Sequence, residues 1–421
     1  MQASELIAVL TESRRRSRAL LEDLTYEQMK VPLLRIINPP IWEIGHVAWF
    51  QEKWVLRHLH GRPPLLDGAD ALWDSIAIPH DDRWSLPLPS RAETIRYTQE
   101  VLDRVIGSLP AGEVSEDEFY FCWLTVMHED MHAEAFTYTR QTLGYAAPYP
   151  YSPPDGLGPD IRDVFVPGGE FRLGAEPGRD GFLFDNEKWA HPVGLHPFSI
   201  ARTAVTNGQF AEFVDDGGYR RPELWSEEGR SWLERERAAH PLYWISDRAG
   251  WHYRHFDRVL PLARHAAIIH VNWYEAEAYC RCAGRRLPTE AEWEMAASPA
   301  KRRFPWGDEP PAPGRASLDA SAGGPIAAGA LESSDSPCGC RQMIGNVWEW
   351  TASDFQPYPG FVIDPYKEYS EPWFTPEYKV LRGGCWVTRS RLIRNTWRNF
   401  YTKDRRDVFG GFRTCAITET A

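Results

Sequence analysis

The strongest chemical signal in the sequence is a pair of histidines four residues apart, His128 and His132, in the string HEDMH. On an α-helix this spacing places both imidazoles on one face, within reach of a single metal ion. Zinc proteases use the same spacing with a catalytic Glu directly after the first His, and Glu129 matches that part of the pattern. The pair therefore predicts a metal site whose third ligand lies elsewhere in the chain.

His46, in the segment NPPIWEIGH, is the candidate for that third ligand. We expect it on an earlier helix, and the cores of helical bundles commonly hold metal ions between facing helices. Three neutral imidazoles leave coordination positions open for water, substrate or O2, which suits iron and zinc alike. The alternative without a metal is that these are ordinary core or surface histidines.

Four segments in the first third of the chain are predicted to be helical, because apolar residues recur there at spacings of three and four. These segments are Glu5–Leu24, Trp42–His60, Ala92–Leu109 and Glu116–Leu143. The second segment contains His46, and the fourth contains both His128 and His132. Together they predict a four-helix bundle that carries the metal ligands.

The composition changes near residue 150, where the string YAAPYPYSPP predicts a linker. We therefore expect two domains, residues 1–150 and residues 160–421. The second is rich in Gly, Pro and Trp and has few long helical patterns, with helices expected at Trp273–Ala283 and Thr289–Ala297. The chain is thus predicted to be an α+β protein in which a helical bundle precedes a loop-rich mixed domain.

Composition and charge exclude several classes of protein. Hydrophobic residues make up 43% and charged residues 25%, which is typical of a folded globular protein. A net charge of −12 without a dense basic segment argues against binding nucleic acid. No apolar run approaches the roughly 20 residues of a membrane helix, and the first segment is amphipathic rather than a signal peptide. We expect a cytoplasmic protein without a membrane segment.

Cysteines and aromatic residues add two further expectations. Seven cysteines are an odd number, so free thiols are expected in place of a complete disulfide framework. Nineteen Trp, 17 Tyr and 19 Phe are more than a generic core needs. Such an excess is typical either of a cleft that binds a cationic ligand or of a loop-rich fold held together by aromatic packing.

Beyond these features, the sequence resembles the non-haem iron sulfoxide synthases of ergothioneine and ovothiol biosynthesis, together with selenoneine synthase. The resemblance lies in PPIWEIGHVAWFQEKW, SLPLPSRAETIRY and the HEDMH helix, and then in FDNEKWAHPV, TAVTNGQFAEF, WYEAEAYC, GRRLPTEAEWE, GNVWEWT and VLRGGCW. It implies a DinB-like four-helix bundle followed by a domain of formylglycine-generating-enzyme-like (C-type-lectin-like) fold. The strings GRRLPTEAEWE and GNVWEWT identify that fold but not the reaction.

The resemblance implies an enzyme that uses Fe(II) and O2 to attach sulfur or selenium to the imidazole carbon of hercynine, the trimethylated betaine of histidine. It implies His46, His128 and His132 as the iron ligands. Trp42 and Phe400 match aromatic residues of the family that contact the trimethylammonium group, which cannot donate hydrogen bonds and is best held by ring faces.

Further substrate contacts follow from the same resemblance. Asn399 matches an asparagine that addresses the imidazole or carboxylate of hercynine, and Tyr366, in PYKEYS, matches a tyrosine that holds the imidazole through water. Arg83 and Arg405 match arginines that bind the carboxylates of a thiol donor, a task for which the guanidinium geometry is suited. Tyr401 is implied at the donor site as well.

Three departures from the thiol-using mycobacterial enzymes concern the donor. Met131 replaces a Gln, Tyr401 replaces an Asp that binds the amino group of the donor, and Ile363 replaces a tyrosine that donates a proton. Losing the Asp removes a charge-assisted hydrogen bond worth about 1.5 to 3 kcal/mol, which argues against γ-glutamylcysteine. We therefore favour a selenosugar donor, as in selenoneine synthase, over a sulfoxide synthase that uses cysteine or γ-glutamylcysteine.

Two interpretations outside this chemistry remain open from the sequence. The histidine spacing alone also fits a zinc hydrolase or thiol transferase built on the bundle. The second domain alone also fits a non-catalytic binding module. A true formylglycine generator needs a reactive cysteine pair after the GG-x-W segment, whereas Cys385 precedes Trp386. We expect Cys385 to be a buried packing residue.

Overall fold

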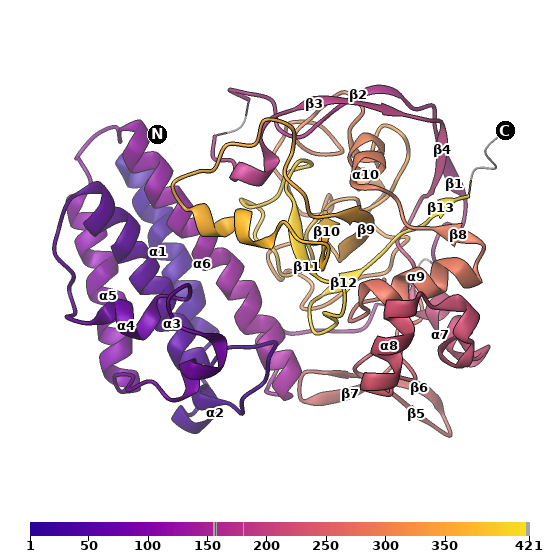
Figure 1. Ribbon diagram of the computed structural model, residues 1–421, viewed down its shortest axis with the longest axis horizontal. Helices are drawn as coiled ribbons and strands as arrows, with labels where there is room; N and C mark the ends of the chain where they lie inside the picture. Colours follow the sequence, from indigo (N-terminus) through magenta and orange to yellow (C-terminus); the bar gives the residue numbers. More distant parts are fainter. Residues whose placement is uncertain (155, 157, 180, 418–421) are drawn as a thin grey trace. The chain divides into compact units, whose positions relative to one another are not determined.

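The computed structural model describes residues 1–154, 156, 158–179 and 181–417 and divides the chain into two compact units, Met1–Arg140 and Gln141–Ala421. The first unit is helical, and the second combines short strands, short helices and long loops (Figure 1). The α+β class predicted from the sequence is confirmed. The division falls inside α6 (Glu116–Leu143), so the domain limits expected from the sequence stay a prediction.

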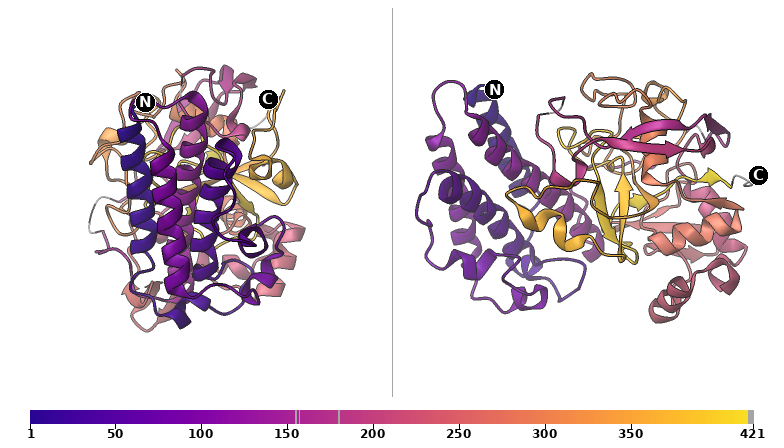
Figure 2. Two further views of the ribbon diagram at one scale, coloured as in Figure 1. Left: turned by 90° about the vertical axis from the view of Figure 1, so that its left-hand side faces the viewer. Right: turned by 45° about the horizontal axis from the view of Figure 1, so that its top comes forward.

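Four long helices form the first unit and run side by side (Figure 2). They are α1 (Ala3–Ala19), α3 (Pro40–Gln51), α5 (Arg91–Ser108) and α6. Their connections contain α2 (Tyr26–Lys30), the π-helix η1 (Glu52–Leu59), α4 (Ala69–Trp73) and the 3-10 helix η2 (His80–Trp84). The four predicted helical segments are confirmed, except that the first ends at Ala19 and not at Leu24, and the second changes from α-helix to π-helix at Glu52.

Helix α3 is the central helix of this unit, and all of its twelve residues are buried. It begins with Pro40 in its first turn, where a missing amide hydrogen costs nothing. Gly45 lets α4 approach closely, because a Cβ at this position would lie 2.2 Å from Nε1 of Trp73. This close approach brings the last turn of α4 next to His46.

The described strands of the second unit form two four-stranded sheets and two smaller ones. The first sheet has the order β1 (Asp163–Val166), β4 (Phe198–Ala201), β13 (Cys415–Ala416), β8 (Arg285–Arg286), and the second has the order β11 (Asn399–Thr402), β10 (Tyr378–Arg382), β9 (Trp348–Asp354), β12 (Gly410–Gly411). The smaller sheets are β2 (Gly169–Leu173) with β3 (His191–Leu195), and β5 (Trp244–Asp247), β6 (Gly250–His255) and β7 (Arg258–Pro261).

Short helices connect these strands. The α-helices are α7 (Asn207–Asp215), α8 (Glu227–Glu236), α9 (Trp273–Cys282) and α10 (Glu290–Ala297), and the 3-10 helices are η3 (Asp185–Glu187), η4 (Gly218–Arg220), η5 (Pro222–Leu224), η6 (Glu332–Ser334), η7 (Lys367–Tyr369) and η8 (Glu371–Trp373). The two helices predicted in this part of the sequence, α9 and α10, are confirmed, and the predicted capping box joins Thr289 and Glu292.

Buried arginine–carboxylate pairs hold the loops of the second unit. Arg398 donates to both carboxylate oxygens of Glu290, at 2.9 and 3.0 Å. Arg413 does the same to Glu349, at 2.6 and 2.7 Å. Each pair joins segments far apart in the sequence, so the long loops between the sheets are fixed without regular secondary structure.

None of the seven cysteines, all of which lie in the described ranges, forms a disulfide bond, and Cys385 is fully buried, as predicted. Within the described ranges, the structure contains no helix that combines the length and apolar character required to span a membrane.

Candidate metal centre

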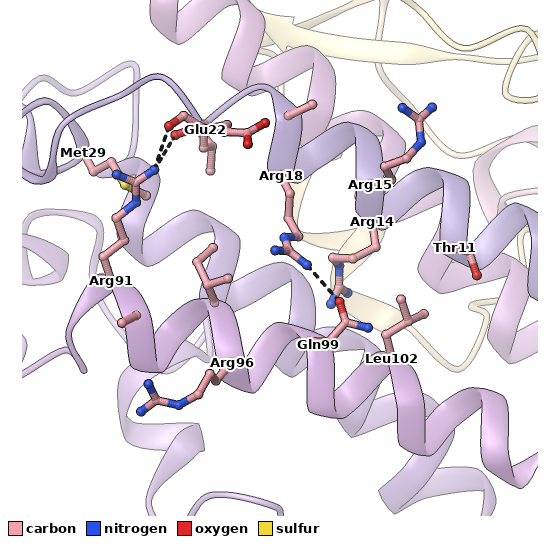
Figure 3. Close-up of a pocket in the computed structure, with 14 residues that line it drawn as sticks. Thr11, Arg14, Arg15, Arg18, Glu22, Met29, Arg91, Arg96, Gln99 and Leu102 are labelled. Carbon is pink, nitrogen blue, oxygen red and sulfur yellow. Dashed lines mark hydrogen bonds between the residues drawn. The ribbon is translucent and has the colours of Figure 1, made fainter.

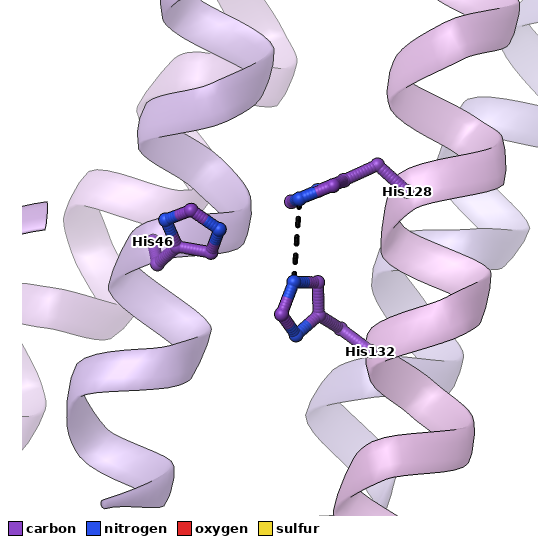
Figure 4. A group of neighbouring side chains, drawn as sticks. All are labelled: His46, His128 and His132. Atoms are coloured by element: carbon purple, nitrogen blue, oxygen red, sulfur yellow. Dashed lines mark hydrogen bonds between the residues drawn. The ribbon is translucent and has the colours of Figure 1, made fainter. Parts of the chain in front are cut away.

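His46 on α3 and the pair His128 and His132 on α6 lie together in the first unit (Figure 4). One ring nitrogen of each lies within 4.8 Å of the others. The Nε2 atoms of His128 and His132 are 3.3 Å apart, and the ring centre of His46 is 5.1 Å from each of the other two. No second group of three or more potential metal ligands was found in the described part of the chain.

The spacing of these nitrogens fits a single metal ion. Two nitrogens bound to one ion at about 2.1 Å, with about 90° between the bonds, are about 3 Å apart. The observed separation of 3.3 Å between Nε2 of His128 and Nε2 of His132 matches this value. The group can therefore hold one ion with three nitrogen ligands and leave coordination positions open.

Hydrogen bonds to Nδ1 fix the orientation of two of the three rings. The backbone carbonyl of Trp73 lies 2.8 Å from Nδ1 of His46, and a carboxylate oxygen of Glu43 lies 2.6 Å from Nδ1 of His132. Both oxygens are acceptors, so the proton resides on Nδ1 and the lone pair on Nε2. This is the tautomer that leaves Nε2 available to a metal.

Burial keeps the two most enclosed histidines neutral. It lowers the pKa of His46 well below the usual 6.5, and the neighbouring His132 lowers it further. The pKa of His128 is lowered well below its usual value for the same two reasons. Metal binding requires neutral imidazole, so both residues are ready to bind an ion at neutral pH.

Aromatic rings enclose the histidines. The ring of Phe50 stacks on His128 with 3.7 Å between centres, and Trp42 stacks on His46 at 5.0 Å. Trp49 stacks on His46 from the next turn of α3, at 5.8 Å. These rings restrict the rotamers of the histidines, so little conformational entropy remains to be lost when an ion binds.

Glu129 and Asp130, which lie between the two histidines in the sequence, point to α1. Glu129 accepts hydrogen bonds from Arg14 at 2.8 and 3.3 Å, and both side chains are buried. Asp130 accepts one from Ser13 at 3.1 Å. Glu129 is therefore not placed as the general base that the zinc-protease pattern requires.

A separate cavity of about 1010 Å³ opens between α1 and α5 (Figure 3). Arginines from both helices line it, including Arg18 and Arg96, together with apolar side chains such as Leu102. None of the three histidines lines it. Arg14 reaches it while donating to Glu129, so the cavity borders the ion pair and not the metal group.

Two of the expected substrate residues lie in the first unit, and both already have partners there. Trp42 is 1% exposed and donates from Nε1 to the carbonyl of Leu72 at 2.7 Å. The guanidinium of Arg83 lies 4.2 Å from the centre of the Trp42 ring and donates to Asn38 at 2.6 Å. A ligand carboxylate at Arg83 therefore competes with these internal contacts.

Asn399, Phe400 and Tyr401 are consecutive residues of β11, the edge strand of its sheet. Alternation along a strand places Asn399 and Tyr401 on one face and Phe400 on the other. Phe400 stacks on Phe355 with 3.9 Å between ring centres. Phe400, the expected aromatic contact, and Asn399, the expected amide contact, therefore lie on opposite faces of one strand.

Tyr366 and Arg405 lie on loops next to this strand. The ring of Tyr366 is 6.1 Å from that of Tyr369, which in turn lies 6.2 Å from Phe400. Arg405 donates to both carboxylate oxygens of Asp407, at 2.7 and 2.8 Å, and its guanidinium lies 5.1 Å from the ring of Tyr401. The structure therefore gathers the expected substrate residues of this unit around β11, with Arg405 paired to a carboxylate.

Sequence reasoning missed three contributors: Glu43, the carbonyl of Trp73, and Asp407. Glu43 had a usable signal, because it precedes His46 by three residues and so shares its helix face. Asp407 also had a usable signal in the sequence, because it lies two residues after Arg405. The Trp73 carbonyl had none, since a backbone atom carries no sequence information.

Comparisons with known proteins cover both units. Residues 10–135 match the DinB superfamily, and residues 155–417 match the sulfatase-modifying factor enzyme 1-like domain. The chain is 35% identical to a hercynine oxygenase of Mycolicibacterium thermoresistibile, over 97% of this chain and 94% of that protein. It is 36% identical to the hercynine oxygenase of Mycobacterium tuberculosis, over 90% and 91%. A formylglycine-generating enzyme of Streptomyces coelicolor is 33% identical over 65% of this chain and 96% of its own length.

Proposed function

The chain belongs to the hercynine oxygenase family, as its sequence motifs predicted, and we propose that it is an Fe(II)- and O2-dependent enzyme that forms a carbon–chalcogen bond at the imidazole of hercynine. The observation that carries this proposal is the near-full-length match to hercynine oxygenases together with the three-histidine group. We propose residues 1–150 as the metal-carrying domain and residues 160–421 as the domain that contributes further substrate contacts.

The proposed iron site rests on the chemistry of its ligands. His46, His128 and His132 supply three neutral nitrogens and leave the remaining coordination positions free. Iron bound there supplies a redox centre for O2 and a template for the two substrates. The three histidines are proposed to bind the ion and fix its position. Glu129 is not proposed as a base at this site, because its carboxylate is engaged with Arg14.

For hercynine, we propose contacts according to the chemistry of each side chain. Trp42 and Phe400 offer aromatic rings to the trimethylammonium group. Asn399 offers an amide, and Tyr366 a hydroxyl, to the imidazole and carboxylate. Because Trp42 is buried against Arg83, a role for Trp42 requires the Arg83 guanidinium to shift away from its ring.

For the donor, we propose Arg83, Arg405 and Tyr401 as contacts and favour a selenosugar. Asp407 already occupies the edge of the Arg405 guanidinium formed by Nε and one Nη, so a carboxylate that binds this edge has to displace it. A neutral sugar has no such competition, and a tyrosine ring offers it a stacking surface. Cysteine and γ-glutamylcysteine remain the alternative donors, for which one O2 supplies the sulfoxide oxygen and the oxygen of one water.

The test is product analysis with defined donors. Protein loaded anaerobically with Fe(II) is mixed with hercynine and one donor at a time, a selenosugar, cysteine or γ-glutamylcysteine, and is then exposed to O2. We expect a hercynine adduct by mass spectrometry, with the selenium isotope pattern for the selenosugar. An adduct with the thiols alone would assign the sulfoxide-synthase alternative. If no donor gives a hercynine adduct, the proposal is rejected. Hydrolytic activity of the zinc-loaded protein would then favour the zinc hydrolase alternative.

A further inference from the structure

Glu43 is a buried carboxylate that contacts a metal-ligand candidate on another helix. It lies on α3, is 1% exposed, and places Oε1 2.6 Å from Nδ1 of His132 on α6. It also precedes His46 by one helical turn, so α3 carries both a candidate ligand and the carboxylate that contacts a second one. Over the ranges that the structure describes, no Lys or Arg forms an ion pair with Glu43.

The contact determines which nitrogen of His132 carries the proton. An ionised carboxylate can only accept, so Nδ1 of His132 donates and Nε2 keeps its lone pair. That lone pair lies 3.3 Å from Nε2 of His128, on the side where the three histidines meet. Without the carboxylate, nothing at Nδ1 selects this tautomer, and part of the population would carry the proton on Nε2, where it blocks a metal.

Glu43 also supplies charge where the candidate ligands supply none. Three neutral imidazoles leave a buried divalent ion with its full charge, which is costly in an apolar environment. Glu129, a buried carboxylate next to His128 in the sequence, is by contrast already paired with Arg14 at 2.8 Å. The carboxylate of Glu43 is one hydrogen bond away from the candidate ligand His132.

We propose that Glu43 is a positioning residue of the metal centre, which sets the tautomer and ring orientation of His132 and offsets part of the charge of the ion. The inference rests on the proposed metal centre, because it assigns Glu43 a role only if the three histidines bind an ion. Outer carboxylates of this kind typically change metal affinity by about 10- to 100-fold when removed.

The first measurement is the dissociation constant for Co²⁺ and for Fe²⁺, by anaerobic competition with a chelator, in wild type, Glu43→Gln and Glu43→Leu. We expect Glu43→Leu to bind about 10- to 100-fold more weakly and Glu43→Gln to lie between, since an amide oxygen still accepts from Nδ1. The matched control is Glu52→Gln: Glu52 is also a buried carboxylate of this unit, and it accepts from Tyr97 and the backbone of Leu65.

The second measurement is the tautomer of His132 in the metal-free protein, read by two-bond ¹H–¹⁵N NMR. We expect the Nδ1–H form in wild type, Glu43→Gln and Glu52→Gln, and a mixture in Glu43→Leu. A purely structural role for Glu43 would lower the melting temperature without changing this signature. If Glu43→Leu does not fold, the affinity of Glu43→Gln relative to Glu52→Gln still decides the question.

The outcomes separate the two proposals. Wild type that binds neither ion would overturn the metal centre itself. Wild type that binds, with both Glu43 variants within about twofold of it and an unchanged His132 tautomer, would overturn the role of Glu43 and leave the metal centre intact.

Discussion

Gly45 is the position where a single methyl group tests how α4 supports the metal site. An ideal Cβ there would lie 2.2 Å from Nε1 and 2.4 Å from Cε2 of Trp73. Trp73 has no room to retreat, because it is fully buried and stacks on Tyr97 with 4.8 Å between ring centres. Gly45→Ala therefore has to displace α4, whose Trp73 carbonyl accepts the hydrogen bond from Nδ1 of His46.

The expected cost combines two effects. Overpacking of a core typically costs about 1 to 3 kcal/mol, and the lost hydrogen bond adds about 1 kcal/mol, which gives about 2 to 4 kcal/mol for Gly45→Ala. At about 3 °C per kcal/mol for a unit of this size, the helical unit should melt about 6 to 12 °C lower. His46 also loses the group that fixes its tautomer, so metal affinity should fall by about tenfold or more.

Thermal unfolding by circular dichroism and metal competition measure both effects in the same sample. The matched control is Gly107→Ala in α5, where an added Cβ meets nothing within 4 Å. That exchange should stabilise the protein by about 0.5 to 1 kcal/mol through helix propensity. If Gly45→Ala melts and binds metal like wild type, the close packing of α4 does not support His46, and the reasoning is wrong.

Three further predictions follow from individual contacts. Glu129→Gln leaves Arg14 buried without its charge partner and should lower the free energy of unfolding, measured in urea, by about 3 kcal/mol. Turnover per folded molecule should persist. Loss of turnover with an intact fold would restore the interpretation of Glu129 as a general base. Burial lowers the pKa values of His255 and His270 to about 3, so the unfolded chain takes up protons below about pH 6.5 that the folded chain does not. Stability should therefore fall as the pH drops from 6.5 to 5, and His255→Phe should flatten the slope by about 1.4 kcal/mol per pH unit; an equal slope in both proteins would contradict this. Asp407→Asn releases Arg405 from its bidentate pair and should lower KM severalfold for γ-glutamylcysteine but not for a selenosugar. An equal change of KM for both donors would show that Arg405 does not bind the carboxylate of the donor.

The sequence predicted the parts of the structure that depend on local spacing. The four helices follow from apolar residues at intervals of three and four, and His128 and His132 share a helix face because they are four residues apart. His46 was predicted as the third ligand because its segment was expected to form another helix of the same bundle. The resemblance to the family came from motifs spread over the whole chain, and the comparisons confirm it.

What could not be predicted depends on contacts between distant segments. The strand order β1-β4-β13-β8 pairs Ile200 with Cys415, and no local pattern encodes that partner. Glu129 illustrates the reverse error. Adjacent to His128 in the sequence, it matched a protease pattern, but one residue of α-helix turns the side chain by about 100°, toward Arg14.

The central claim is that His46, His128 and His132 together hold one Fe(II) ion that makes the protein a hercynine-dependent, O2-consuming enzyme. The most direct measurement is the iron content of anaerobically loaded wild type and of His46→Ala, His128→Ala and His132→Ala, together with O2 consumption in the presence of hercynine and donor. We predict one iron per wild-type chain, and loss of both iron and O2 consumption in each variant with the fold retained by circular dichroism. Full iron content and turnover in any one of the three variants would contradict the claim.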